Sequence, residues 1–175
     1  MVKILFVIPP HNFRDIEYFE PKNVLERAGY KVITTSNVID EVSGIESGKA
    51  DVEIHSRDVN VVDYDGIVFV GGVGMIEFIS DFDFIHLAKE FYEHGKIVAA
   101  ICSAVGILAK AGILRGKRAT GWQGISEIIE AAGGEYSPNQ IEISGNIITA
   151  HGPEAVKDFA EALQRAFTNL RLSNQ

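Results

Sequence analysis

Cysteine is the scarcest reactive residue of this chain, because Cys102 is the only one in 175 residues. A single cysteine cannot form an internal disulfide, and no group of cysteines and histidines has the spacing of a zinc site. These absences favour a reduced, cytoplasmic protein without a metal centre. Long apolar segments are also missing. The longest uncharged one, residues 97–109, is too short to cross a bilayer, and the run at residues 4–8 is too short for a signal peptide.

Basic side chains are in the minority. The chain has 16 lysines and arginines against 24 aspartates and glutamates, which gives a formal net charge of -8 at pH 7. Affinity for nucleic acid comes mainly from clustered lysine and arginine, and the group Arg115, Lys117 and Arg118 is too small to supply it. We therefore expect no nucleic-acid partner and no membrane partner.

Apolar runs of strand length alternate with segments of helical periodicity, without an internal repeat or a low-complexity linker. Strands that alternate with helices form mostly parallel sheets with helices on both faces. We predict a single α/β domain over residues 1–175, whose sheet is extended at one edge by a late antiparallel hairpin. The predicted strands are residues 3–8, 31–36, 66–70, 97–101 and 118–120 with the hairpin 141–143 and 147–150; the helices are 15–28, 83–94, 103–111, 124–132 and 154–167; residues 42–60 form a small hairpin or an edge excursion.

The strand predicted at residues 97–101 delivers Cys102 to the start of a helix. A thiol at such a turn lies above the carboxyl end of the sheet with backbone N–H groups ahead of it, which is the geometry of a nucleophile elbow. Ala100 and Ala104 are small enough for this tight turn. A free cysteine is also among the residues most often buried as filler. The helix start, however, would lower the pKa of the thiol and favours a reactive thiolate.

Glu17 is the candidate carboxyl partner of this thiol. As an ordinary residue of a first helical turn, it would simply complement the helix dipole. Pro21 cannot donate the backbone hydrogen bond that the Glu17 carbonyl normally accepts, so we expect a distorted helix and an inward-tipped Glu17 side chain. A buried carboxyl would keep its proton and donate a hydrogen bond to the sulfur, whereas an ionised one would oppose thiolate formation. The sequence leaves both couplings open.

A glycine pair, Gly71 and Gly72, ends the strand predicted at residues 66–70. Such a pair is usually a turn, and it also lets the Gly72 N–H group approach a ligand oxygen closely. Together with the Ser103 N–H group it would form an oxyanion hole opposite Cys102. Ligands of parallel sheets bind at the carboxyl ends of the strands, where the strand order reverses. We therefore expect these groups to converge on one pocket with the residues that follow the first strand.

Two glycine-containing segments suggest phosphate binding but fail on spacing. Residues 44–49, Gly-Ile-Glu-Ser-Gly-Lys, are one residue short of a P-loop and lack the serine or threonine that follows its lysine. Gly72-Val-Gly74 lacks the third glycine of the dinucleotide fingerprint, because Glu77 occupies that position. We expect no cofactor.

Five segments carry a family resemblance: Lys3-Ile-Leu-Phe-Val, Phe13-Arg-Asp-Ile-Glu with Pro21 after it, Asp65-Gly-Ile-Val-Phe-Val-Gly-Gly, Ile97-Val-Ala-Ala-Ile-Cys, and Ala111-Gly-Ile-Leu-Arg-Gly-Lys-Arg-Ala-Thr. In this order they resemble the ThiJ/PfpI family, which includes PfpI-type intracellular proteases and the parkinsonism-associated deglycases. The resemblance covers nearly the whole chain. It implies a flavodoxin-like three-layer sandwich and assembly into homodimers or larger rings. It also implies Cys102 as nucleophile, Glu17 as its partner, Gly72 and Ser103 as oxyanion donors, and His151-Gly152-Pro153 as part of the pocket wall.

Two departures from the family pattern concern the proton-transfer partner. The protease-like branch has a histidine directly after the cysteine, where this chain has Ser103. Other members place one after the short strand, where this chain has Gly121 and Trp122. His151 is the best substitute among the five histidines, because it lies at a predicted strand end, although a solvent-facing loop position is equally compatible with its pattern. Trp122 is a candidate for the pocket wall.

These residues favour a cysteine-dependent, hydrolase-type enzyme that acts on a carbonyl centre. Its substrate would be a peptide or amide, or a 2-oxoaldehyde or glycated adduct as in deglycases and glyoxalases. Without a histidine beside Cys102 to protonate an amine leaving group, small activated carbonyls are chemically easier. The alternative is a non-catalytic redox sensor or stress-protective protein, in which Cys102 oxidises to a sulfinate stabilised by Glu17. A regulatory ligand-binding module is a third, weaker reading.

Overall fold

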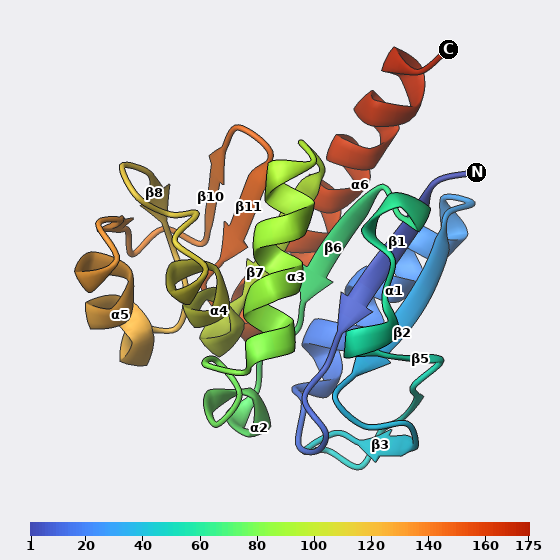
Figure 1. Cartoon of the computed structure of the whole chain (residues 1–175), viewed down its shortest axis with the longest axis horizontal. Helices are drawn as coiled ribbons and strands as arrows, with labels where there is room; N and C mark the ends of the chain where they lie inside the picture. Colours follow the sequence, from blue (N-terminus) through green and yellow to red (C-terminus); the bar gives the residue numbers. More distant parts are fainter.

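A seven-stranded sheet forms the centre of the molecule in a computed structural model that describes residues 1–175 (Figure 1). The strand order is β10-β11-β7-β6-β1-β2-β5, and every pairing is parallel except that of β10 with β11. Its strands are β1 (Lys3–Val7), β2 (Lys31–Ser36), β5 (Ile54–His55), β6 (Gly66–Phe69), β7 (Ile97–Ile101), β10 (Ile141–Ser144) and β11 (Ile147–Ala150). Two small two-stranded sheets lie outside it, β3 (Glu41–Ser43) with β4 (Lys49–Asp51) and β8 (Arg118–Ala119) with β9 (Glu135–Tyr136).

Helices cover both faces of this sheet (Figure 1). Two of them pack against each other on one face, and the others belong to the opposite face. The first pair is α1 (Asp15–Arg27) with α6 (Val156–Ser173); the opposite face carries α3 (Phe82–Glu93), α4 (Val105–Lys110) and α5 (Ser126–Ala131), and the one-turn helix α2 (Val73–Ile76) follows β6.

Strand β1 shows why the sheet is covered on both sides. Ile4 and Phe6 belong to the core beneath α1 and α6, whereas Leu5 and Val7 belong to the core beneath α3 and α4. Successive side chains of a strand point to opposite faces, so a strand that is apolar at every position must be buried twice. The run of apolar residues in the sequence is therefore the direct cause of the three-layer arrangement.

The inner strands follow the order β2-β1-β6-β7-β11, which is the flavodoxin-like order. The order reverses between β1 and β6, and the crevice at their carboxyl ends is where ligands bind in such sheets. The predicted fold class is confirmed, including the antiparallel hairpin that extends the sheet beyond β7.

Most predicted elements are present, with differences where the sequence signal was short. The segment 42–60 contains the expected hairpin, β3 with β4, and then the edge strand β5. Strand β9 and helix α2 were not predicted, because each is too short to show a periodic pattern of apolar residues. Helix α6 continues past the predicted end at Phe167 to Ser173, because Leu170 still packs against the core.

Two properties of the chain bear on ligands and membranes. None of its helices combines the length and the apolar character that a bilayer crossing requires. Nor does the structure place three or more histidine, cysteine, aspartate or glutamate side chains together as a set of metal ligands.

Candidate active site at the Cys102 turn

Cys102 lies at the turn between β7 and the helical segment that follows it. Its φ angle is +60°, in the left-handed region that a non-glycine residue seldom adopts. A short 3-10 turn, Cys102–Ala104, leads into α4, and the Trp122 N–H group donates a hydrogen bond to the Cys102 carbonyl at 3.2 Å. Strained backbone of this kind persists only where its surroundings hold it. The predicted elbow is therefore present in the backbone itself.

Two backbone N–H groups lie near the Cys102 sulfur. They belong to Gly72 and Ser103, and each lowers the pKa of the thiol. The Ser103 hydroxyl also donates to the Gly72 carbonyl at 2.9 Å, which ties the glycine turn to the elbow. Gly72 has φ +116°, and a Cβ there would come within 2.5 Å of the Arg14 backbone nitrogen. Only glycine fits this position.

Glu17 is fully buried beside this sulfur, with no exposed surface. Neither of its carboxyl oxygens has an oxygen or nitrogen donor in the protein, and its interacting polar side chain is the Cys102 thiol. Gly71 makes the approach possible, since a Cβ on that glycine would lie 2.7 Å from the Cys102 Cβ and 3.1 Å from Glu17 Oε1. The structure thus brings the predicted pair together.

The reason for the burial of Glu17 differs from the one expected. Helix α1 runs continuously through Pro21, and Glu17, Pro21 and Leu25 are all buried. Residues four apart share one face of a helix, so Glu17 occupies the same inward stripe as Pro21 and Leu25. The carboxyl points inward because of its register on the helix, and a kink is not needed to explain it.

Burial raises the pKa of Glu17 to about 8. Loss of hydration is the largest cause, and the charge of Glu154 adds to it, whereas the positive charge of Arg14 and the hydrogen bond with Cys102 act in the opposite direction. At neutral pH the carboxyl therefore carries a proton. Of the two couplings that the sequence left open, this favours the protonated carboxyl as a donor toward the sulfur.

Burial also raises the pKa of the Cys102 thiol, to about 12. The charge of Glu17 is the second cause, and the N–H groups of Ser103 and Gly72 together with Arg14 only partly offset the two. The expectation of a lowered thiol pKa is thus wrong for the resting pair, because desolvation outweighs the backbone donors. While Glu17 keeps its proton, however, its contribution to the thiol pKa is absent.

A cavity of about 360 Å³ opens at the elbow. The predicted wall residues Trp122 and Pro153 line it, whereas Gly152 is buried and is not among the lining residues. Trp122 is 41% exposed, so it is a rim residue and not part of the core. The lining residues are Arg14, Ile45, Gly72, Val73, Ile76, Cys102, Ser103, Trp122 and Pro153.

His151 does not line this cavity. Strand β11 is next to β7, with Ala150 opposite Ile101, so the His151 backbone follows the strand that neighbours the cysteine. Its ring, however, is hydrogen-bonded through Nδ1 to the carboxylate of Glu154, three residues on. The predicted role of His151 as proton-transfer partner of Cys102 is therefore not supported, because the side chain is engaged by a local partner that the strand-end pattern does not reveal.

Arg14 is the site residue that sequence reasoning missed. It precedes α1, its backbone N–H group donates to the Gly71 carbonyl at 3.0 Å, and its side chain lines the cavity. The only sequence signal was a charged residue in the loop after the first strand, a position that polar solvent-facing residues also occupy.

The glycine segment 44–49 proves to be the turn of the β3–β4 hairpin, and it binds a carboxylate of the chain itself. The N–H groups of Glu46 and Gly48 donate to the two oxygens of Asp15 at 2.9 Å and 2.7 Å. A Cβ at Gly44 would come within 2.2 Å of the same carboxylate. This attachment to the start of α1 places Ile45 at the rim of the cavity.

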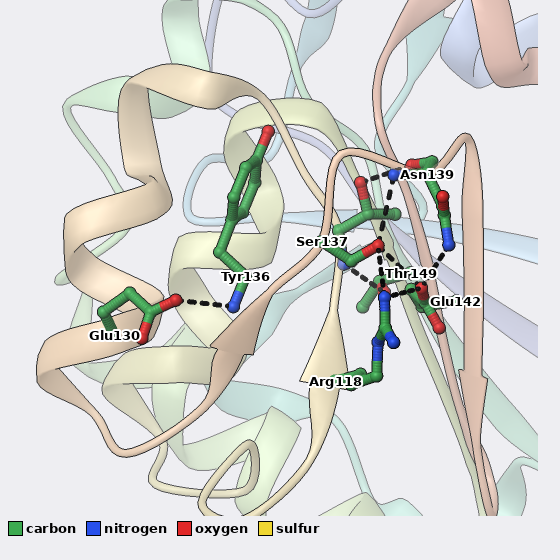
Figure 2. Close-up of polar contacts among 8 residues, drawn as sticks. Arg118, Glu130, Tyr136, Ser137, Asn139, Glu142 and Thr149 are labelled. Carbon is green, nitrogen blue, oxygen red and sulfur yellow. Dashed lines mark hydrogen bonds and ion pairs between the residues drawn. The ribbon is translucent and has the colours of Figure 1, made fainter.

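A polar cluster fixes the segment that leads to Trp122 (Figure 2). We call it the Glu142 cluster; it consists of Arg118, Thr120, Ser137, Asn139, Glu142 and Thr149. Glu142 Oε1 accepts hydrogen bonds from Ser137 and Asn139 at 2.7 Å and 2.8 Å, and lies 3.5 Å from the Arg118 guanidinium. The Thr120 N–H group donates to Thr149 at 3.0 Å. The hydrogen bond from Ser137 is the main cause of a lowered Glu142 pKa.

An α/β protein with a cysteine elbow, two N–H donors and a buried carboxyl is the class that the fold and the site define. Residues 2–166 match the DJ-1/PfpI family, and the chain belongs to that family. It is 32% identical to the putative cysteine protease YraA of Bacillus subtilis over 97% of this chain and 99% of that protein. Deglycase PfpI of Pyrococcus furiosus is 28% identical over 87% of this chain and 91% of its own. A ThiJ/PfpI domain protein from Brachyspira murdochii has a solved structure with a TM-score of 0.93 and 36% identity, covering 95% of this chain and 96% of the other.

Proposed function

We propose that this protein is a cysteine-dependent enzyme that acts on small activated carbonyl compounds, with Cys102 as nucleophile. The observation that carries this proposal is the position of the sulfur: it borders an open cavity, two backbone N–H groups lie near it, and the carboxyl of Glu17 lies beside it. A relative named a cysteine protease and another named a deglycase support chemistry at a carbonyl centre.

The chemistry would begin with addition of the thiol to the carbonyl carbon. The Sγ–C bond forms, the π bond of the carbonyl breaks, and the thiol proton ends on the oxygen. Glu17 is the adjacent group that can carry this proton, while the Gly72 and Ser103 N–H groups would hold the oxygen as charge develops. With an acyl substrate the leaving group departs with the proton, and water then cleaves the thioester.

Small carbonyls are favoured over peptides because no histidine lines the cavity. Ser103 follows the cysteine, and the ring of His151 is paired with Glu154 outside the cavity. An amine leaving group needs a proton donor within hydrogen-bond reach. Glu17, the protonated group beside the sulfur, has no exposed surface and does not line the cavity. A 2-oxoaldehyde or its adduct needs no such donor for the addition step.

The test is turnover of methylglyoxal, of a glycated amine and of a peptide reporter by the wild type and by Cys102→Ala. We expect loss of turnover in Cys102→Ala with unchanged circular dichroism, and turnover of the small carbonyls in preference to the peptide. Wild-type protein that turns over none of them, or a Cys102→Ala variant that remains active, would contradict the proposal.

A redox sensor is the second candidate, and the protonated Glu17 favours it. A carboxylic acid beside the sulfur can donate a hydrogen bond to a sulfinate oxygen. Low doses of peroxide would then add oxygen to Cys102, as seen by mass spectrometry, in a protein that turns over none of the substrates above. Glu17→Gln separates the two candidates further, since it retains a donor but cannot move a proton.

A further inference from the structure

Arg14 is the one charged side chain that lines the Cys102 cavity. No carboxylate lies within ion-pair distance of its guanidinium, and the guanidinium donates no hydrogen bond to another side chain or to a backbone carbonyl. The residue is half-buried. An arginine that is partly desolvated and unpaired in a cavity has five free N–H donors in a planar fork that matches a carboxylate.

No carboxyl group of the protein forms an ion pair with Arg14. Arg14 interacts electrostatically with Glu17 and Glu154. The first holds a proton at neutral pH, and the second lies beyond ion-pair distance of the guanidinium, with its Oε1 hydrogen-bonded to His151 Nδ1. The positive charge therefore remains in the cavity of a protein whose net charge is -8.

The rest of the cavity lining also favours a negatively charged ligand. Its N–H donors, from Gly72 and Ser103, also attract negative charge, while Ile45, Val73 and Ile76 present apolar surface around them. Low-polarity walls strengthen a charge interaction at the rim, because less water screens it.

We propose that Arg14 selects substrates that carry a carboxylate close to the reacting carbon. Arg14 would bind the carboxylate, the N–H groups would hold the carbonyl oxygen, and the apolar rim would contact the remainder of the molecule. This inference rests on the proposed function only in taking Cys102 as the reacting atom, and it names Arg14 as the residue that determines specificity.

The test compares two alkylating reagents that differ in charge, iodoacetate and iodoacetamide. Each rate of labelling at Cys102 is divided by the rate with N-acetylcysteine, and the ratio of the two results measures preference for the carboxylate. We expect a ratio of about fivefold or more in favour of iodoacetate, as an attraction of about 1 kcal/mol would give. In Arg14→Gln the ratio should fall to about one or below, and Arg14→Lys should retain part of it.

Arg27→Gln is the matched control. It removes the same charge from the exposed end of the same helix, about 20 Å away along α1, and should leave the ratio unchanged. If Arg14 acted only by lowering the thiol pKa, Arg14→Gln would slow both reagents equally and the ratio would not move.

The outcomes separate the two proposals. Labelling by both reagents without a preference, or a preference that survives in Arg14→Gln, overturns the assignment of Arg14 while leaving Cys102 as an accessible nucleophile. Labelling by neither reagent overturns both, because the thiol would then be closed to any substrate.

Discussion

Glu17 and Glu142 are two carboxyl groups of the same fold with opposite electrostatic behaviour. Glu142 accepts hydrogen bonds from Ser137 and Asn139 and faces Arg118, and its pKa is lowered (Figure 2). Glu17 is buried without an oxygen or nitrogen donor, and its pKa is raised to about 8. Desolvation by burial raises the pKa of Glu17, whereas the hydrogen bond from Ser137 is the main cause of the lowered pKa of Glu142.

This contrast separates a structural region from a reactive one. Buried polar groups are normally satisfied, and an unsatisfied one lowers stability unless it serves another purpose. The Glu142 cluster follows that rule. Glu17 violates it beside a cysteine whose φ angle is also unfavourable, and both departures meet at the cavity. Local instability is therefore concentrated where a reaction would take place.

The largest expected effect is the pH dependence of stability that Glu17 imposes. The folded-state pKa, about 8, lies above the ordinary value of 4.5. Between these values the native protein binds a proton that the unfolded chain releases, so native stability falls as pH rises, by about 1 kcal/mol per pH unit. Glu17→Gln removes this dependence. Its free energy of unfolding relative to that of the wild type should therefore increase from about pH 5 to pH 8, as measured by urea unfolding at each pH. A difference between the two proteins that does not change with pH would show that Glu17 does not have a raised pKa in the folded state.

The next effect is that of placing a methyl group between the two members of the pair. Gly71→Ala would put a Cβ 2.7 Å from both the Cys102 Cβ and the Ile101 carbonyl oxygen. We expect a loss of about 2 kcal/mol in unfolding free energy from overpacking, together with a changed rate of iodoacetamide labelling at Cys102.

Gly106→Ala is the control for this substitution. Its added methyl group would meet only Ile79, at 3.3 Å or more, so its labelling rate should equal that of the wild type. Unaltered stability and labelling in Gly71→Ala would mean that Glu17 and Cys102 are not held against Gly71.

The smallest of the three effects concerns the Glu142 cluster, whose carboxylate has hydrogen-bond donors. Glu142→Gln should lower stability by about 1 kcal/mol at neutral pH through weaker hydrogen bonds from Ser137 and Asn139. Because the folded-state pKa of Glu142 is lowered, the contribution is present above the ordinary glutamate value and disappears as the pH falls through the folded value. Thermal unfolding at neutral and acid pH measures this, and Glu26→Gln, in the exposed pair with Lys22, should change stability by less than about 0.5 kcal/mol. A Glu142 effect no larger than that of Glu26 would remove the distinction between the two regions.

Much of the fold could be predicted because it depends on patterns within single segments. The apolar runs that became β1, β6 and β7 are continuous, and strands of that kind must be buried on both faces. The elements that were missed, α2 and β9, are too short to show a period. The site was predictable to the extent that it sits at strand ends, which is how Cys102, Gly72 and Ser103 were found.

The positions of the His151 and Arg14 side chains could not be predicted in this way. Both follow or border strand ends, yet one ring pairs with Glu154 and the other side chain enters the cavity. Which of the two would reach the cavity depends on rotamers and on partners from other segments, and those are not encoded in local spacing.

The amino-acid sequence alone determined the order of strands and helices, the placement of the cysteine at a turn, and the register that turns Glu17 toward the sheet, because each follows from side-chain periodicity along one segment. Only the tertiary structure decided that Glu17 lies beside the thiol without an oxygen or nitrogen donor, that burial raises the pKa values of both groups, and that Arg14 is left without an ion pair. The physical reason is that hydration and charge at a site are set by groups distant in the chain, which meet only when the sheet has formed.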